Sequence, residues 1–327
     1  MKILAMYLPQ FHCVKENDEW WGEGFTEWVT VKKAKSLYEG HKQPNIPHNE
    51  NYYNLLEKSV FEWQADLVKK SGIDGVCIYH YWFEKGRQIL EKPAELLLQW
   101  NDIELPFCFS WANETWARTW SNLTDKNVWA SSFENVKKSK ESGILLNQKY
   151  GDVDDWKMHF EYLLSFFKDS RYIKIDNKPV IVIHKANDMH CLENMVEVWN
   201  TLAIRNGFSG IYVVGNALRD SQKNSCDSIF ICQPGAAMQI CPSTEKNGVQ
   251  CYDYDEVWKN ILSQTMSEKT TMGAFVGYDD TPRHGTFGSV IENASPEKFE
   301  KYMGLLVEKN KKNGSDLMFI NAWNEWG

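Results

Sequence analysis

The sequence predicts an α/β protein built as a (β/α)8 barrel of the TIM type, and two observations support this prediction. Eight short segments are almost continuously apolar and rich in β-branched or aromatic residues, which is typical of parallel strands buried on both faces. Amphipathic segments of helical length lie between most of them, and strands that alternate with helices build parallel sheets. Eight is the strand number of a TIM barrel, and an open doubly wound sheet is the alternative.

The predicted elements follow one another along the whole chain. The eight strands are expected at residues 2–8, 75–83, 106–111, 179–184, 210–217, 227–234, 272–278 and 316–323. Among the helices, one ends at Gly72, one opens in an acidic turn at 154–155, and one stops at Gly207. The last helix begins with Ser295 as N-cap and Pro296 at the first helical position.

No linker, low-complexity tract or internal repeat divides the 327 residues, so a single catalytic barrel domain over residues 1–327 is expected. Long loops follow its first and third strands. The last strand ends almost at the C-terminus, and no sequence remains for the helix that would cover it. We therefore expect a barrel without its last helix, truncated after Gly327.

Charge and composition exclude several classes of partner. The chain has 44 acidic and 36 basic residues, a net charge of -8, which is the wrong sign for a protein held on nucleic acid or anionic lipid. No apolar run is long enough to span a membrane, and the N-terminus lacks a signal-peptide cleavage site. The eight cysteines include no C-x-x-C pair, which favours a reducing, cytoplasmic location, and the irregular spacing of Cys226, Cys232, Cys241 and Cys251 argues against zinc. No metal, cofactor or protein partner is predicted.

In such a barrel, function lies at the C-terminal ends of the strands, and here those ends carry acids, amides, histidines and indoles. Indole faces stack on the apolar faces of a pyranose ring, and amides and acids bind its hydroxyl groups. The chain has neither G-x-G-x-x-G nor a Walker A loop for phosphate. An oligo- or polysaccharide is therefore the expected ligand. The predicted binding residues at these ends are Gln10, His12, His80, Tyr81, Trp82, Trp111, Asn113, Trp116, His184, Asp279, Asp280, Arg283, Trp323 and Asn324.

Two Asn-Glu pairs follow the third and eighth strands, in WANETW at 111–116 and NAWNEWG at 321–327. Glycosidic chemistry generally uses two carboxyl groups, and strands three and eight lie three steps apart around an eight-strand ring. Glu114 is therefore the predicted general acid/base and Glu325 its partner carboxylate. In the alternative interpretation both residues only bind substrate or form ion pairs with Arg118 and Arg283.

Two further acidic patterns have competing interpretations. Asp279 and Asp280 either form a site with Glu325, with one raised pKa, or belong to an ordinary turn before Pro282. Asp253-Tyr254-Asp255 has the Asp-x-Asp form of metal-dependent nucleotide-sugar transferases, but capping of the helix that begins there explains it without a metal. A non-catalytic saccharide-binding barrel is the remaining alternative class.

Several long motifs resemble one family. They are YLPQFH at 7–12, NDEWWGEGFTEW at 17–28, GIDGVCIYHYWF at 72–83, FCFSWANETWARTW at 107–120, YDDTPR at 278–283 and NAWNEWG at 321–327. Together they resemble the WbsX family, described as glycosyltransferases of bacterial O-antigen and other surface polysaccharide clusters. The fold of that family looks like the barrel of glycoside hydrolase family 99, which contains retaining endo-α-mannosidases with two carboxylates.

The resemblance implies roles for residues in these motifs. It covers nearly the whole chain and carries over to Glu27, Glu114, Asn324 and Glu325, and Trp21 joins the expected binding residues within the second motif. In the family the last motif continues into a further acidic segment, which is absent after Gly327. The expected function is a carbohydrate-active enzyme that makes or breaks glycosidic bonds in a bacterial surface polysaccharide, with lipopolysaccharide O-antigen as one example.

Overall fold

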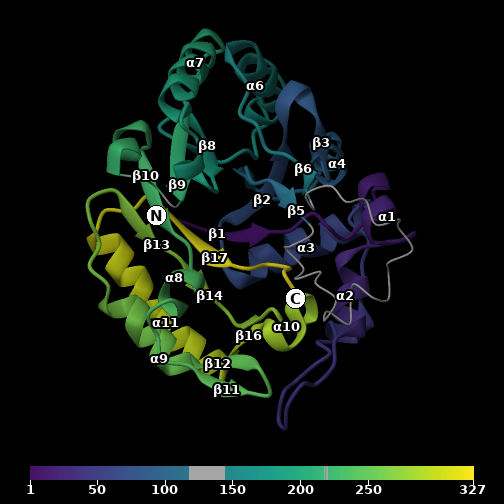
Figure 1. The fold of residues 1–327 in the computed structure, drawn as a ribbon. Coiled ribbons are helices and arrows are strands. Elements are labelled where there is room, and N and C mark those ends of the chain that lie inside the picture. Colours follow the sequence, from purple (N-terminus) through teal and green to yellow (C-terminus); the bar gives the residue numbers. More distant parts are fainter. Residues whose placement is uncertain (118–143, 217, 219) are drawn as a thin grey trace.

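A ring of parallel strands forms the centre of the molecule (Figure 1). The computed structural model describes residues 1–117, 144–216, 218 and 220–327. In spatial order the strands of the ring are β13 (Thr270–Met272), β10 (Ser228–Ile231), β9 (Tyr212–Asn216), β8 (Lys178–Ile183), β4 (Phe107–Trp111), β2 (Gly75–Trp82), β1 (Lys2–Tyr7), β17 (Leu317–Asn321) and β14 (Ala274–Phe275). All pairings between neighbours along this path are parallel.

One interrupted strand closes the ring. β13 and β14 stand at the two ends of the path, yet only Gly273 separates them in the chain. A Cβ at Gly273 would lie 2.9 Å from the carbonyl oxygen of Ile231, so glycine allows the close approach at this break. The nine described strands therefore occupy eight positions, one at each predicted segment. The predicted barrel is confirmed, and the open doubly wound sheet is excluded.

Helices connect the strands on the outside of the ring (Figure 1). Within the described residues the α-helices are α1 (Lys15–Trp21), α2 (Glu27–Lys33), α3 (Lys58–Ser71), α4 (Lys92–Gln99), α6 (Val153–Phe167), α7 (Leu192–Arg205), α8 (Gly235–Met238), α9 (Tyr254–Ser263), α10 (Thr281–His284) and α11 (Pro296–Lys312). Short 3-10 turns lie at His48–Glu50, Glu84–Gly86, Ala186–Asp188, Asp220–Ser225 and Gly285–Phe287.

The predicted helix boundaries agree with the structure. Gly72 ends α3 in the left-handed conformation, with φ of 73°. Asp152 caps α6 by accepting hydrogen bonds from the backbone N–H groups of Asp154 and Asp155, and Ser295 caps α11 in the same way. Each cap pairs backbone donors that the first helical turn leaves open.

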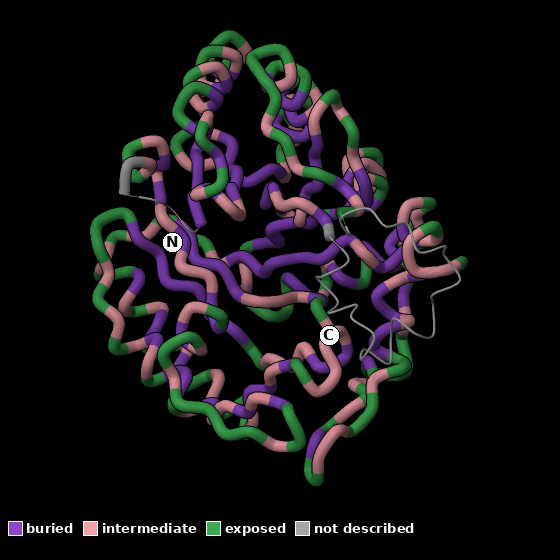
Figure 2. The backbone as a smooth tube through the Cα atoms, in the orientation of Figure 1, coloured by how far each residue is buried: buried purple, intermediate pink, exposed green. Residues whose placement is uncertain are grey.

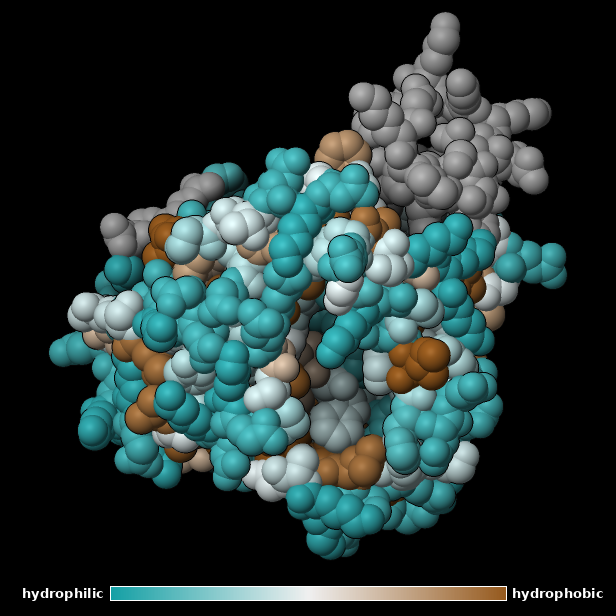
Figure 3. Space-filling view, turned by 90° about the horizontal axis from the view of Figure 1, so that it is seen from below, coloured by the Kyte–Doolittle hydropathy of each residue, from teal (hydrophilic) through white to brown (hydrophobic). Residues whose placement is uncertain are grey.

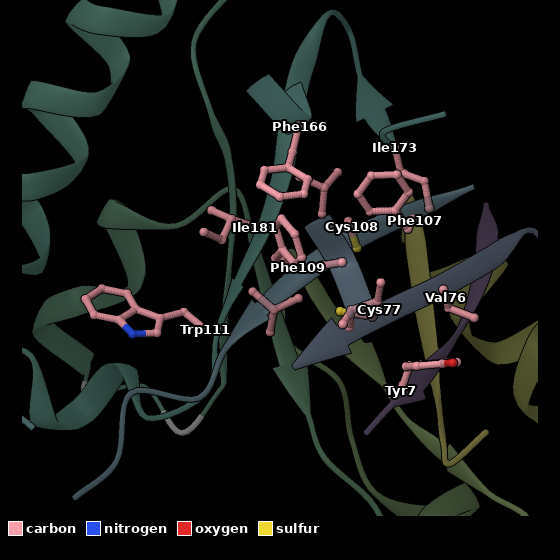
Figure 4. Close-up of a cluster of buried hydrophobic side chains, with 14 of the residues drawn as sticks. Tyr7, Val76, Cys77, Phe107, Cys108, Phe109, Trp111, Phe166, Ile173 and Ile181 are labelled. Atoms are coloured by element: carbon pink, nitrogen blue, oxygen red, sulfur yellow. The ribbon is translucent and has the colours of Figure 1, made fainter. Parts of the chain in front are cut away.

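Aromatic side chains fill the space between the strands and the helices. Figure 4 shows part of this core, where Phe107 and Phe109 of β4 lie close to Phe166 of α6. The rings of Phe109 and Phe166 meet edge to face with centroids 4.9 Å apart. Figure 2 shows the same division along the backbone, with buried strands inside and exposed helix surfaces outside. Because the strands are buried on both faces, their sequence is continuously apolar.

Smaller strand pairs lie outside the ring. The strands β11 (Thr244–Lys246), β12 (Val249–Asp253), β16 (Ser289–Glu292) and β15 (Tyr278–Asp279) form a separate sheet in that order. β5 (Trp116–Ala117) pairs with β6 (Ile144–Leu146), and β3 (Gln88–Ile89) and β7 (Lys174–Ile175) pair with ring strands.

The surface drawn in Figure 3 is mainly hydrophilic, and hydrophobic residues occur on it in separate patches. In the described parts of the chain, no helix combines the length and the apolar character that a membrane crossing requires.

Candidate functional site

A cavity of about 680 Å³ lies at the C-terminal ends of the barrel strands, where the predicted function would lie. Of the predicted site residues, its described wall contains Gln10, Trp21, Glu27, Tyr81, Glu114, Trp116, His184, Arg283 and Glu325. The wall also contains Leu8, Phe25, Thr30, Tyr79, Ala112, Leu145, Lys185, Tyr278 and His284. Aromatic side chains and charged groups therefore face the same space.

Strand alternation explains which residues of β2 reach the cavity. Tyr79 and Tyr81 line it, whereas His80 and Trp82 point to the opposite face of the strand and pack against α6. His80 Nε2 lies 2.9 Å from Nε2 of His159 in α6, in the buried core. The structure thus places His80 and Trp82 away from the candidate site.

The two Asn-Glu pairs have the same construction. The Asn113 side chain accepts a hydrogen bond from the backbone N–H of Lys185 at 2.7 Å and donates one to its carbonyl at 2.9 Å. Asn324 makes the same two bonds to Leu8, at 2.7 and 2.8 Å. In both cases the asparagine holds the next strand of the ring, and the glutamate that follows lines the cavity.

Asn113 and Asn324 were both predicted to bind substrate, but their amide groups are engaged by the backbone. Each is also buried, at 0% and 3% exposure. Both amide groups are therefore used within the fold, where they position the glutamates that follow them, Glu114 and Glu325.

Glu114 lies beside two basic groups at the end of β8. Its Oε1 is 3.2 Å from His184 Nε2, and its Oε2 is 3.9 Å from Lys185 Nζ. Burial alone would raise the pKa of Glu114, but the hydrogen bond from His184 and the charges of His184 and Lys185 together lower it. The resting state of Glu114 is therefore a carboxylate.

Arg283 joins the other two glutamates of the wall. One of its terminal nitrogens is 3.3 Å from Glu27 Oε1, and the other is 3.8 Å from Glu325 Oε1. Burial raises the pKa of Glu27, only partly opposed by the charge of Arg283, and the charge of Glu325 raises it further. The ion pair between Arg283 and Glu325 is the contact expected in the alternative, non-catalytic interpretation, whereas Arg118 lies outside the described residues.

Asp279 and Asp280 hold the short helix α10 that carries Arg283. Asp279 accepts hydrogen bonds from Gln43 at 2.7 Å and from both the N–H and the hydroxyl of Thr281, and it lies 2.9 Å from His41 Nε2. Asp280 accepts bonds from the backbone N–H of Ser289 and the hydroxyl of Tyr278. Neither aspartate lines the cavity, so the interpretation as a structured turn before Pro282 fits better than a site shared with Glu325.

Three further predicted binding residues lie behind the cavity wall. His12 is 2% exposed, and burial lowers its pKa to about 4. Trp111 donates from its indole nitrogen to the carbonyl of Trp82 at 3.0 Å, inside the core. Trp323 packs against the same core and donates its backbone N–H to Met6. Their surroundings assign these three side chains to the framework of the site.

The sequence analysis missed Tyr79 and Lys185 as wall residues. Tyr79 has the same parity as Tyr81 in β2, so the two-residue period of a strand would have identified it. Lys185 directly follows the predicted binding residue His184 at a strand end. Other additions, such as Phe25 between α1 and α2 and Leu145 in the short strand β6, lie outside the ring of strands, where the sequence pattern does not predict their positions.

The acidic and cysteine side chains of the described segments do not come together as a metal centre. Asp253 caps α9, as predicted, and Asp255 pairs with Lys298 at 2.6 Å. No group of three or more His, Cys, Asp or Glu side chains in the described parts of the chain could hold a metal ion.

Comparisons with known proteins agree with this architecture. The GH99 endo-alpha-mannosidase from Bacteroides thetaiotaomicron has a TM-score of 0.53 and 12% identity, over 99% of this chain and 85% of that one. A protein described as glycoside hydrolase-like gives a TM-score of 0.54 and 9% identity, over 99% of this chain and 84% of that one. At such low identity, the likeness shows a shared barrel fold.

Sequence comparisons identify the family. The protein WxcX of Xanthomonas campestris pv. campestris (strain B100), described as uncharacterized, is 29% identical over 344 residues, covering 99% of this chain. The aligned part is 46% of WxcX, so this chain spans about half the length of that relative. The profile of the family described as "Glycosyltransferase WbsX" matches residues 3–327. Since this match covers nearly the whole chain, the protein belongs to the WbsX glycosyltransferase family.

Proposed function

We propose that this protein makes or breaks glycosidic bonds in a polysaccharide, with Glu114 and Glu325 as the two working carboxyl groups. One observation carries the proposal: two equivalent Asn-Glu pairs, after β4 and β17, bring both carboxylates to the wall of one cavity. Glycosidic chemistry uses such a pair, one group to protonate the leaving oxygen and one to act as base or nucleophile.

The cavity wall suits a saccharide. Trp21, Trp116 and Tyr81 offer aromatic faces for pyranose rings, and the charged groups and Gln10 offer partners for hydroxyl groups. A volume of about 680 Å³ falls within the range of small-molecule sites, roughly 300–1,000 Å³. A short stretch of a polysaccharide would occupy it.

The electrostatics favour different roles for the two glutamates. The sequence predicts Glu114 as the general acid/base, but His184 and Lys185 hold it as a carboxylate, so we assign it the role of base or nucleophile. Glu27 and Glu325 share the one guanidinium of Arg283, and a proton on this trio relieves the repulsion between the two carboxylates. Glu325 is the more accessible of the two carboxyl groups, with 31% of its side chain exposed against 8% for Glu27, so we assign the second catalytic role to Glu325.

The charges on the wall favour a saccharide donor over a nucleotide sugar. The described basic side chains of the wall, Arg283, Lys185, His184 and His284, each lie within 4.0 Å of a carboxylate oxygen. A diphosphate would have to compete with these carboxylates for every one of them. Transfer to a sugar acceptor in place of water uses the same two carboxyl groups, which is compatible with the glycosyltransferase description of the family.

We also propose a wider setting for this activity. The substrate is a bacterial surface polysaccharide such as an O-antigen, and the protein acts in the cytoplasm. A saccharide-binding barrel without catalysis is the competing function, because the Arg283–Glu325 ion pair requires no chemistry.

A calorimetric binding screen tests the proposal. Purified protein is titrated with nucleotide sugars in the presence of Mg²⁺ or Mn²⁺, and separately with mannose- and rhamnose-containing oligosaccharides. We expect an oligosaccharide to bind, with Arg283→Met weakening that binding. Binding of a nucleotide sugar, but of no oligosaccharide, would contradict the proposal and favour a nucleotide-sugar transferase.

A further inference from the structure

A second concave site lies at the edge of the barrel, between the chain segment 48–52 and helix α3. It is an open hollow of about 550 Å³ and is lined by His48, Asn49, Glu50, Asn51, Tyr52 and Trp63. None of these residues lines the cavity that contains Glu114 and Glu325.

The polar side chains of this second site have no hydrogen-bond or ion-pair partners among the described residues. Within the described part of the chain, His48, Asn49, Glu50 and Asn51 make no side-chain hydrogen bond or ion pair, and all four are exposed. In the main cavity, by contrast, the carboxylates of the wall all lie near basic groups. Open amide, imidazole and carboxylate groups on a concave surface are available for a hydroxyl-rich ligand.

Two aromatic side chains stand beside these polar groups. Trp63 lies on α3, outside the buried stripe that contains Phe61, Gln64 and Val68, and it is 39% exposed. Tyr52 is half-buried, with the ammonium group of Lys32 3.9 Å from its ring centroid. An aromatic face next to free amides is the combination that binds a pyranose ring.

The backbone of the segment is held in an uncommon conformation. Asn49 and Glu50 are consecutive non-glycine residues with φ of 55° and 53°, in the left-handed region. Such conformations cost roughly 1–3 kcal/mol each and are concentrated at binding and active sites. Here they turn the side chains of the segment outward beside Trp63.

The second site lies on the same end of the barrel as the main cavity. Segment 48–52 belongs to the connection from β1 to α3, which leaves β1 at its C-terminal end. The ring of Tyr52 meets Trp28 edge to face at 5.2 Å, and Trp28 is 5.7 Å from Trp326. Trp28 and Trp326 directly follow Glu27 and Glu325, so an aromatic row joins the two sites.

We propose that the second site binds another stretch of the same polysaccharide, with a sugar ring stacked on Trp63 beside Tyr52. This inference rests on the proposed function, since it assumes a polysaccharide substrate. Binding at both sites raises the effective concentration of the polymer at the main cavity. A polysaccharide chain that spans both sites gains from the second site, whereas an oligosaccharide that fills only the main cavity does not.

Affinity electrophoresis tests this inference. The protein runs in native gels that contain yeast α-mannan, a rhamnan or dextran, and its retardation gives an apparent Kd. With the polymer that retards the wild type, we expect Trp63→Ala to raise the Kd about threefold to tenfold, the worth of one lost stacking contact. Trp63→Phe should keep part of the affinity, because it retains an aromatic face.

Matched controls separate this inference from the proposed function. Ile204→Ala removes an exposed apolar side chain from α7, 60% exposed, and should leave retardation unchanged. Equal retardation of wild type and Trp63→Ala would overturn the second site while leaving the main cavity intact. Absence of retardation in all three polymers, together with no oligosaccharide binding in the calorimetric screen, would instead overturn the proposed function, and the second site with it.

Discussion

Asn324 pairs with both backbone groups of Leu8, accepting from its N–H at 2.7 Å and donating to its carbonyl at 2.8 Å. The side chain thus supplies the donor and the acceptor that a neighbouring strand would supply, at the point where β1 leaves the ring. Asn113 does the same for Lys185 at the end of β8. In each case the residue after the asparagine is a glutamate of the cavity wall. The hydrogen bonds of the asparagine, called the clamp below, therefore also fix the position of that glutamate.

Removal of the clamp should destabilise the fold. Asn324→Ala leaves the N–H and carbonyl of the buried Leu8 without partners, and each unpaired group costs about 1–3 kcal/mol. We expect the free energy of unfolding to fall by about 2–4 kcal/mol in urea denaturation. Asn101→Ala, in an exposed turn, serves as the control and should change it by less than about 0.5 kcal/mol. Equal stability of the two variants would contradict the role of the clamp.

Loss of the guanidinium that joins two glutamates should also cost stability. Arg283→Met leaves the buried Glu27 without its ion partner at neutral pH. We expect a loss of about 3 kcal/mol, the low end for a broken buried pair, because Arg283 itself is 32% exposed. Adding Glu27→Gln to this variant removes the unpaired charge and should recover part of the loss. A double variant less stable than Arg283→Met alone would show that the ion pair is not the cause.

Buried histidines should make the protein sensitive to acid. Burial lowers the pKa of His12 to about 4 and that of His80 to about 3, and burial together with His80 lowers the pKa of His159. Below pH 6.5 the unfolded chain binds protons at these positions that the folded chain does not bind. Stability should therefore fall with decreasing pH, by about 1.4 kcal/mol per pH unit for each histidine, down to about its folded pKa.

Urea denaturation between pH 7 and pH 5 measures this slope. His12→Met should flatten it by the contribution of one histidine, because the replacement does not titrate. His190→Gln, at an exposed position, is the matched control and should keep the wild-type slope. If His12→Met leaves the slope unchanged, the acid sensitivity has another origin.

The pairing of Glu114 with His184 predicts the direction of a pKa change. Burial is the largest influence on Glu114, and it raises the pKa, whereas His184 and Lys185 lower it. His184→Ala removes the hydrogen bond and leaves burial opposed only by Lys185 3.9 Å away. The pKa of Glu114 should therefore rise, as measured by carbon-detected NMR titration of the side-chain carboxyl group. A fall in this pKa would contradict the proposed electrostatics.

The barrel could be predicted from sequence because its strands are short, apolar and bounded by helix signals. Residues such as Gly72 and Ser295 marked helix ends through local chemistry, and the structure confirms both. The break at Gly273 could not be predicted, because it depends on the close approach of Ile231 from a neighbouring strand.

The site was harder to predict than the fold. The sequence places His80 and Tyr81 side by side at a strand end, but the two side chains point to opposite faces of β2. Likewise, an asparagine beside a glutamate resembles a sugar-binding group, and only the tertiary structure reveals its backbone partner. The two-residue period of a strand predicts that Tyr81 and His80 point to opposite faces. The hydrogen bonds of Asn113 and Asn324 depend instead on which strands are neighbours in the ring, and the sequence pattern alone does not give this order.

The most direct test of the account is polysaccharide turnover by two cavity variants. New reducing ends, or a change in chain length, are measured with the polysaccharide that the wild type binds, for wild type, Glu114→Gln and Glu325→Gln. We expect both variants to lose turnover while their affinity stays within about tenfold, or about 1.4 kcal/mol, because the amide keeps the shape but not the proton chemistry. Wild-type turnover in either variant would contradict the assignment of that carboxyl group to catalysis.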